Sequence, residues 1–295
     1  MIKRVMSVLA ALSAVVATLI VLPATTASAA ECAPSWQSSS VYWGGGSASY
    51  NGHNWSAKWW TQNERPGTSD VWADQGSCGS GGGGGEPAPS GFLVSQAQFN
   101  QMFPSRNSFY TYSGLTAALS AYPGFANTGS DTVKKQEAAA FLANVNHETG
   151  GLVHIVEQDT ANYPHYCDTS QSYGCPAGQA AYYGRGPIQL SWNYNYKAAG
   201  DALGIDLLGN PWQVERNASV AWKTGLWYWN TQNGPGTMTA HNAMVNGAGF
   251  GETIRSINGR VECNGGNPAQ VQSRIDNYMR FTSMLGVSAG GNLGC

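Results

Sequence analysis

The chain has 295 residues and a formal net charge of −2, and charged residues make up only 11% of it. An ordinary soluble domain carries roughly 25% charged residues, and partners such as nucleic acids or anionic membranes attract basic proteins. The composition therefore argues against both of these partners. The chain is instead rich in Trp, Tyr, Asn, Ser, Thr and Gly. This favours an uncharged sugar polymer, because amides hydrogen-bond to sugar hydroxyls and aromatic rings pack on the C–H faces of sugars.

Residues 1–30 have the pattern of a secretory signal peptide. Lys3 and Arg4 precede an apolar run over 5–22, and the sequence Ala-Ser-Ala that ends at residue 29 resembles a cleavage site. The run is long enough for a membrane anchor, but its content of Ser, Thr and Ala favours removal. We expect cleavage near residue 29 or 30 and a soluble, extracellular protein that has no membrane contact after cleavage.

Residues 31–79 predict a small β-rich module. Aromatic stretches separated by glycines occur at residues 41–43, 48–50 and 55–62, and such alternation is typical of short strands. Trp59 and Trp60 are neighbours, so in a strand they point to opposite faces and at least one of them is expected to be exposed. The alternative is that both rings belong to the core of a very small fold.

Residues 80–90 are rich in Gly and Pro and predict a flexible linker that reaches roughly 15 to 20 Å. Helix signals dominate residues 91–295, so we expect one mostly helical domain that is large enough for a single core. Helix starts are expected at caps formed by Ser95, Ser113 and Asp131, and later helices over 218–230 and 271–285. The last helix is expected to bury one face, made of Ile275, Tyr278, Met279, Thr282 and Leu285.

Two carboxylates stand close together in the sequence. The helix after Asp131 is expected to end at Gly150 and Gly151, which places Glu148 in its last turn and on its core-facing side. The negative end of a helix dipole favours a neutral carboxyl group, so Glu148 is a candidate acid. Glu157 follows a short apolar run and precedes polar residues, where a hydrated carboxylate suits a base. For two arbitrary glutamates, a helix end and a solvated loop residue would be the commoner explanation.

A zinc site is not favoured. His147 and Glu148 lack a second His one helical turn later, and His154 lies beyond the helix-breaking glycines. We therefore expect no metal and no cofactor.

Six cysteines agree with an oxidising compartment and allow fifteen pairings. Their order along the chain favours three pairs, Cys32 with Cys78, Cys167 with Cys175, and Cys263 with Cys295. A metal site formed by these residues would need closely paired cysteines, which the sequence lacks.

Several motifs in order resemble those of family 19 chitinases and span nearly the whole helical domain. They are His-Glu-Thr-Gly-Gly around Glu148, Tyr-Tyr-Gly-Arg-Gly-Pro-Ile-Gln-Leu-Ser ending at Ser191, Asn-Tyr-Asn-Tyr ending at Tyr196, and the segments 223–229 and 257–263. In the small module, Ala-Lys-Trp-Trp-Thr over 57–61, with residues 63–66 after it, resembles the chitin-binding modules of carbohydrate-binding family 5/12.

The resemblance implies a mainly α, lysozyme-like catalytic domain and a role for each matching residue. Glu148 matches the general acid, Glu157 the general base, and Ser191 the residue that helps to hold the attacking water. The positions that match sugar-binding residues are Tyr173, Gln189, Asn195, Lys223 and Asn258, with Trp59 and Trp60 on the module. Glu262 and Arg274 match a charged network around the acid. Crowded carboxylates also need an arginine on physical grounds, whereas the alternative for Arg274 is an exposed helix residue.

The resemblance implies a monomeric, secreted endochitinase whose partners are chitin polymer and chitin oligomers. The family inverts anomeric configuration, which requires carboxyl groups roughly 6.5 to 9.5 Å apart. The short spacing from Glu148 to Glu157 is similar to that of compact bacterial members. Two alternatives stay open, namely a peptidoglycan or chitosan hydrolase on the same scaffold, and an antifungal, lectin-like binding protein that uses Trp60.

Overall fold

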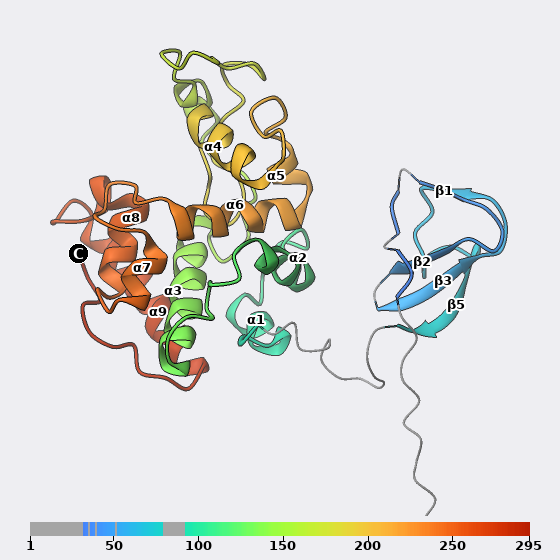
Figure 1. Ribbon diagram of the computed structural model, residues 1–295, viewed down its shortest axis with the longest axis horizontal. Coiled ribbons are helices and arrows are strands. Elements are labelled where there is room, and N and C mark those ends of the chain that lie inside the picture. The colour runs from blue at the N-terminus through green and yellow to red at the C-terminus, as the bar shows by residue number, and fades with distance from the viewer. Residues whose placement is uncertain (1–31, 35, 39, 51, 79–91) are drawn as a thin grey trace, which may run out of the picture. The chain divides into compact units, whose positions relative to one another are not determined.

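The computed structural model describes residues 32–34, 36–38, 40–50, 52–78 and 92–295. The chain divides into two compact units, one before and one after residue 85, and each is described separately below (Figure 1). The expected signal peptide over 1–30 and linker over 80–90 lie outside the described residues. The exact domain boundaries stay a prediction.

The smaller unit consists of short antiparallel strands. They are β1 Val41–Tyr42, β2 Ser47–Tyr50, β3 His53–Ala57, β4 Thr61–Gln62 and β5 Trp72–Ser77. β2, β3 and β5 form one sheet in that order, and β1 pairs with β4. Its core is small, with Ala48, Ala57, Val71 and Trp72 buried. The Cys32–Cys78 disulfide closes the unit, as expected, and supplies stability that so small a core lacks.

The larger unit is helical. Its α-helices are α1 Gln96–Met102, α2 Tyr112–Ala118, α3 Asp131–Thr149, α4 Asn193–Leu203, α5 Gln213–Arg216, α6 Ala218–Thr231, α7 Ala240–Val245, α8 Phe250–Glu262 and α9 Pro268–Met284. Two 3₁₀ helices, η1 Leu119–Ala121 and η2 Thr160–Tyr166, join them. In Figure 1, α3 runs through the middle of the unit, with α7, α8 and α9 on one side and α6 crossing near its end. The expected mainly helical fold is confirmed. No helix in the described part of the chain is long and apolar enough to cross a membrane.

Two hydrophobic clusters hold these helices together. The first surrounds α3, where Phe141 packs against Trp222 and Trp229 of α6 at ring distances of 6.2 and 5.4 Å. The second lies around α4, where the rings of Tyr182 and Tyr196 pack edge to face. α6 contributes to both clusters, so it joins the α3 side of the unit to the α4 side. The cleft described below is lined by residues from both sides.

Two of the three expected helix caps are wrong. Ser95 caps α1 with a capping box, as expected. However, Thr111 caps α2 and Ser130 caps α3, because their hydroxyls accept the N–H groups of Gly114 and Val133. Ser113 and Asp131 therefore lie in the first helical turn, one or two residues after the caps. Several Ser and Thr residues precede each helix, and the sequence alone does not say which of them takes the cap.

The buried face of α9 also differs from the expected one. Its fully buried residues are Arg274, Tyr278, Phe281 and Thr282, whereas Met279 is 50% exposed. Successive residues of a helix are about 100° apart, so the next position after Tyr278 turns away from the core. The sequence pattern assigned Met279 to the core because it is apolar, and left Arg274 out because it is charged.

A buried carboxylate ties α3 to its neighbours at the end opposite to Glu148. Glu137 is fully buried. Its Oε1 accepts the N–H of Trp229 Nε1 at 3.0 Å and faces His241 Nδ1 at 2.6 Å, and its Oε2 accepts the Ala126 N–H at 2.9 Å. The hydrogen bond that His241 donates to Glu137 raises the pKa of His241, although burial opposes this.

We expect the His241 interaction to make stability depend on pH. Because the folded-state pKa of His241 is raised, the contribution of this histidine to the free energy of unfolding is complete below pH 6.5. It is lost as the pH rises through the folded-state pKa. The free energy of unfolding of the wild type should therefore exceed that of His241→Gln by roughly 1.5 to 3 kcal/mol at pH 5.5, and by less at pH 8.5. Thermal unfolding at both pH values measures this, and a difference that does not change with pH would contradict it.

Candidate active site

α3 delivers Glu148 to the surface of a cleft. Gly150 has φ 60° and ψ 41°, in the left-handed region, and stops the helix two residues after Glu148. Glu148 thus lies in the last turn, as expected, and follows Asn144 by one turn on the same face of the helix. Its side chain is 17% exposed, so most of it is covered while its carboxyl group reaches the cleft.

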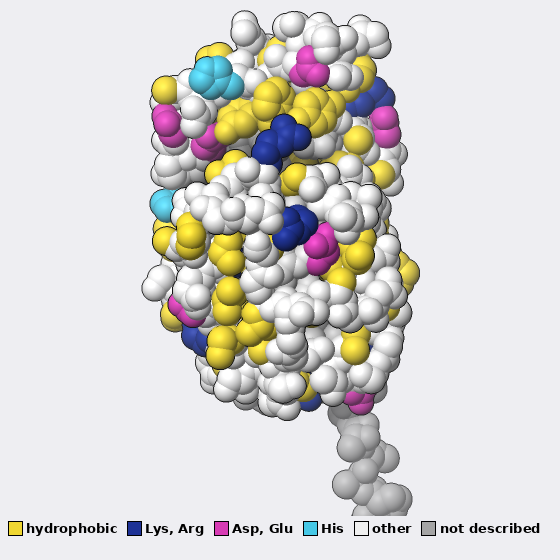
Figure 2. Space-filling view, turned by 90° about the vertical axis from the view of Figure 1, so that its left-hand side faces the viewer, with side chains coloured by type: hydrophobic (Ala, Val, Ile, Leu, Met, Phe, Trp, Pro, Cys, Tyr) yellow, Lys and Arg dark blue, Asp and Glu magenta, His cyan; other side chains and the backbone are white. Residues whose placement is uncertain are grey.

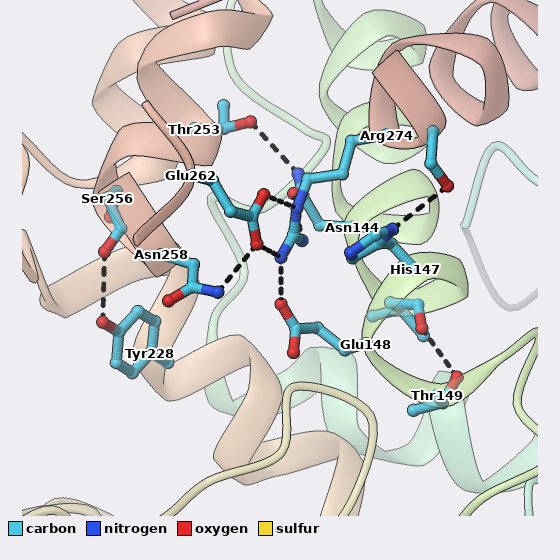
Figure 3. Close-up of polar contacts among 12 residues, drawn as sticks. Asn144, His147, Glu148, Thr149, Tyr228, Thr253, Ser256, Asn258, Glu262 and Arg274 are labelled. Atoms are coloured by element: carbon cyan, nitrogen blue, oxygen red, sulfur yellow. Dashed lines mark hydrogen bonds and ion pairs between the residues drawn. The ribbon is translucent and has the colours of Figure 1, made fainter. Parts of the chain in front are cut away.

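Arg274 of α9 joins this carboxyl group to a second one (Figure 3). Its guanidinium is fully buried, and its Nη2 donates to Glu148 Oε1 and, at 2.7 Å, to Glu262 Oε1. Nε donates to Glu262 Oε2 at 2.8 Å, and Nη1 donates to Asn144 Oδ1 at 3.0 Å. The structure therefore brings together the three charged residues that the sequence motifs grouped. The alternative of an exposed Arg274 is wrong.

Charges in this network are balanced. Burial alone would raise the pKa of Glu262, but the hydrogen bonds and charge of Arg274, with a bond from Asn258, outweigh burial and hold this pKa below its usual value. Burial alone would lower the pKa of Arg274, but Glu148 and Glu262 together raise it. Burial and the nearby guanidinium lower the pKa of His147, so this ring is neutral near pH 7. Glu262 and Arg274 thus form an ionised pair beside Glu148.

Glu157 also lines the cleft, and its carboxylate accepts hydrogen bonds from uncharged donors. Its Oε1 accepts the Tyr166 hydroxyl at 2.9 Å and the Asn162 amide at 3.1 Å, and its Oε2 accepts the Gly184 N–H at 3.3 Å. Burial, together with the bond to Glu157, raises the pKa of Tyr166, so this hydroxyl stays protonated and can donate. The expectation of a simply hydrated loop carboxylate is wrong in part, because η2 folds back and supplies two of these donors.

Both carboxyl groups line one cleft of about 850 Å³. Ser191, Gln189, Asn195 and Asn258 line it as well. Tyr173 and Lys223 are not among its lining residues. The Tyr173 hydroxyl instead donates to Gln171 Oε1 at 3.1 Å. The structure thus gathers six of the eight expected catalytic and sugar-binding residues of the larger unit, and the sugar contacts of the other two stay a prediction.

The segment that carries Gln189 and Ser191 is strained and strongly supported. Gln189 and Trp192 have φ values of 51° and 74°, which residues other than glycine rarely adopt. Arg185 exchanges backbone hydrogen bonds with Leu190 of this segment. Its side chain is buried and donates to Glu215 at 2.7 Å and to the Tyr196 hydroxyl at 2.8 Å. Such strain persists only where surrounding contacts enforce it, and it is common at functional sites.

Several residues of this site were not predicted from the sequence. Asn162 and Tyr166 contact Glu157, Asn144 contacts Arg274, and Tyr228 lines the cleft. Asn144 precedes Glu148 by four residues on a helix, so its position on the same face was a usable signal. In the described residues, no three His, Cys, Asp or Glu side chains gather as a metal site would require.

In the smaller unit, Trp59 and Trp60 are 56% and 49% exposed. They lie in a bend between β3 and β4 and not within a strand, so the expected alternation of faces does not apply and both rings reach solvent. The alternative in which both belong to the core is wrong. Trp43, after β1, is 69% exposed and was not singled out from the sequence.

Comparison with known families identifies the class of protein that this fold and cleft define. Residues 93–295 match the model of the family described as chitinase class I, which is glycoside hydrolase family 19. The chain belongs to this family. The carboxylate pair, the buried arginine and the strained segment all fall within the matched residues.

Individual relatives agree with this assignment. The chain is similar to chitinase C from Streptomyces griseus HUT6037, at 74% identity over 90% of this chain and 100% of that one, with a TM-score of 0.69. A bacterial family 19 chitinase is 82% identical over 69% of this chain and 100% of its own, also with a TM-score of 0.69. Endochitinase B of Zea mays is 47% identical over 188 residues, 63% of each chain. The match thus spans less than two thirds of that curated relative's length.

Proposed function

We propose that this protein is a secreted endochitinase that hydrolyses β-1,4 bonds between N-acetylglucosamine units with inversion of anomeric configuration. The single observation that carries the proposal is the placement of two carboxyl groups with different surroundings in one cleft. Arg274 aims Glu148, whereas neutral donors hold Glu157. Related chitinases of plants and Streptomyces support chitin as the substrate.

In this proposal Glu148 is the general acid. It transfers its proton to the glycosidic oxygen as the bond from that oxygen to the sugar C1 breaks, and the leaving sugar departs with a new hydroxyl group. A single cation beside an acid would favour the ionised form. Glu262 balances the charge of Arg274, so that the arginine can orient the carboxyl group without leaving an uncompensated positive charge beside it.

Glu157 is the general base. Its carboxylate takes a proton from a water molecule, whose oxygen forms the new bond to C1 on the opposite face of the sugar. Ser191 helps to hold that water, and the amides of Gln189, Asn195 and Asn258 bind sugar hydroxyls and N-acetyl groups along the cleft. After each turnover, Glu148 is ionised and Glu157 protonated, and proton exchange with solvent restores both.

The surface and the disulfides support the proposed substrate and location. Figure 2 shows a face on which charged side chains are scattered singly over a mostly uncharged surface, while hydrophobic side chains gather in a band in its upper half. Such a surface suits a neutral polymer. Three disulfides fit a protein that works in an oxidising, extracellular environment.

Hydrolysis of defined polymers tests the proposal. The full chain should cleave a soluble N-acetylglucosamine hexamer to shorter oligomers and should leave peptidoglycan and fully deacetylated chitosan uncut. Faster release of soluble fragments from peptidoglycan or from chitosan would reassign the substrate. Binding to chitin without any cleavage would favour the lectin-like alternative.

We further propose that the smaller unit binds chitin through Trp59 and Trp60. Each aromatic ring that packs on a sugar contributes binding free energy. A loss of about 1.4 kcal/mol of binding free energy lowers the affinity tenfold. We expect Trp59→Ala with Trp60→Ala to weaken adsorption to insoluble chitin by roughly tenfold or more, and to slow its hydrolysis. Hydrolysis of the soluble hexamer should stay within about twofold of wild type, because a tethered module raises only the local concentration. Equal losses on both substrates would contradict this role.

A further inference from the structure

α8 is interrupted at a functional position. Asn258 has φ −140° and ψ 26°, which are not helical values. The same residue lines the cleft, and its Nδ2 donates to Glu262 Oε1 at 2.7 Å. A group that enters the hydrogen-bond ladder of a helix is one cause of such an interruption. The contacts made by the residues just before Asn258 therefore bear on how this amide is placed.

Ser256, two residues before the interruption, is held from outside the helix. The Tyr228 hydroxyl donates to the Ser256 carbonyl oxygen at 3.1 Å (Figure 3). Ser256 Oγ donates to the Gln232 carbonyl oxygen, also at 3.1 Å. Gly234 packs so closely that a Cβ at this position would lie 1.9 Å from the Ser256 oxygen and 2.6 Å from the Tyr228 hydroxyl. The end of α6 and the segment after it thus contact α8 closely at Ser256.

Tyr228 is suited to a fixed donor role. Burial, with a contribution from the negative charge of Glu148, raises the pKa of Tyr228 to about 12. Its hydroxyl therefore stays protonated across the pH range in which the enzyme would work. Tyr228 thus both lines the cleft and donates a hydrogen bond to the α8 backbone.

We propose that Tyr228 is a positioning residue for the acid. By holding Ser256, it fixes the interruption of α8 and the direction of the Asn258 amide. Asn258 then holds Glu262, which holds Arg274 against Glu148. This inference rests on the proposed function of Glu148, and it extends the support of the acid to α6, which carries Tyr228.

Tyr228→Phe tests the role, because it removes only the hydroxyl. We expect kcat on the soluble chitin hexamer to fall by about tenfold. The matched control is Tyr112→Phe on α2. It removes an equivalent hydrogen bond, which the Tyr112 hydroxyl donates to the Val94 carbonyl oxygen at 2.8 Å. Both variants should lower Tm by a similar amount, about 2 to 4 °C, but the control should keep kcat within about twofold.

A double-mutant cycle separates positioning from a general structural effect. If Tyr228 acts through Asn258, then Tyr228→Phe should change kcat by less than twofold in an Asn258→Ala background. A tenfold loss that persists in this background would overturn the inference in favour of direct contact with substrate. A Tyr228→Phe enzyme that keeps more than half of wild-type kcat would overturn it outright.

The proposed function and the role of Tyr228 are tested by different results. A wild-type chain with no activity on chitin oligomers would overturn the proposed function and, with it, this role of Tyr228. An active wild-type enzyme that Tyr228→Phe does not affect overturns only the inference about Tyr228.

Discussion

Glu148→Gln should lower kcat on a soluble chitin hexamer by about 100-fold or more. Glutamine has the size and shape of glutamate and can still accept the hydrogen bond from Arg274, but it cannot transfer a proton to the glycosidic oxygen. The thermal midpoint and the affinity for chitin should therefore stay close to wild type. Steady-state kinetics and thermal unfolding of the same preparation measure both quantities.

Glu252→Gln is the matched control for this substitution. Glu252 lies in the first turn of α8, where it bonds to Thr237 and pairs with Arg255, and it is not among the residues that line the cleft. Its replacement should leave kcat within about twofold. If Glu148→Gln kept more than about a tenth of wild-type activity, Glu148 could not be the acid.

Arg274→Ala should be the most destabilising single change in the site. It leaves the fully buried Glu262 carboxylate without its partner, and breaking such a pair typically costs about 3 to 5 kcal/mol. It also releases Glu148, so activity should be lost even where the variant folds. Arg280→Ala, on an exposed face of the same helix, should cost less than about 1 kcal/mol.

The cost of Arg274→Ala should depend on pH. The folded-state pKa of Glu262 is lowered, so its contribution is present above the unfolded-state pKa, near 4.5, and is lost as the pH falls through the folded-state value. The difference in stability between wild type and Arg274→Ala should therefore be largest near pH 7 and smaller near pH 3.5. Denaturant unfolding at both values measures it. An equal difference at the two pH values would show that Arg274 does not lower the pKa of Glu262 in the folded enzyme.

Local rules predicted the position of Glu148, the proposed acid. A helical pattern followed by Gly150 and Gly151 fixes where α3 ends, and this determines where Glu148 leaves the helix. The three disulfide pairs also followed from the order of the cysteines along the chain.

Other features depend on contacts between distant segments, which no local pattern encodes. Arginine is usually found at the protein surface. Arg274 is nevertheless buried, because Glu148 and Glu262, on two other helices, form ion pairs with it. Two of the three neutral donors to Glu157, Asn162 and Tyr166, come from η2, a 3₁₀ segment that the sequence did not predict. The interruption of α8 at Asn258 is likewise set by Tyr228 and Gly234, which are more than twenty residues away.

The anomeric form of the first products tests the central claim most directly. A nucleophilic Glu157 would need its carboxyl group about 5 to 5.5 Å from that of Glu148, whereas a base leaves roughly 6.5 to 9.5 Å for a water molecule. Proton NMR of a chitin hexamer digest, recorded before mutarotation, distinguishes the two mechanisms. We predict that the new reducing ends appear first as the α-anomer. An initial excess of the β-anomer would contradict the assignment of Glu157 as the base.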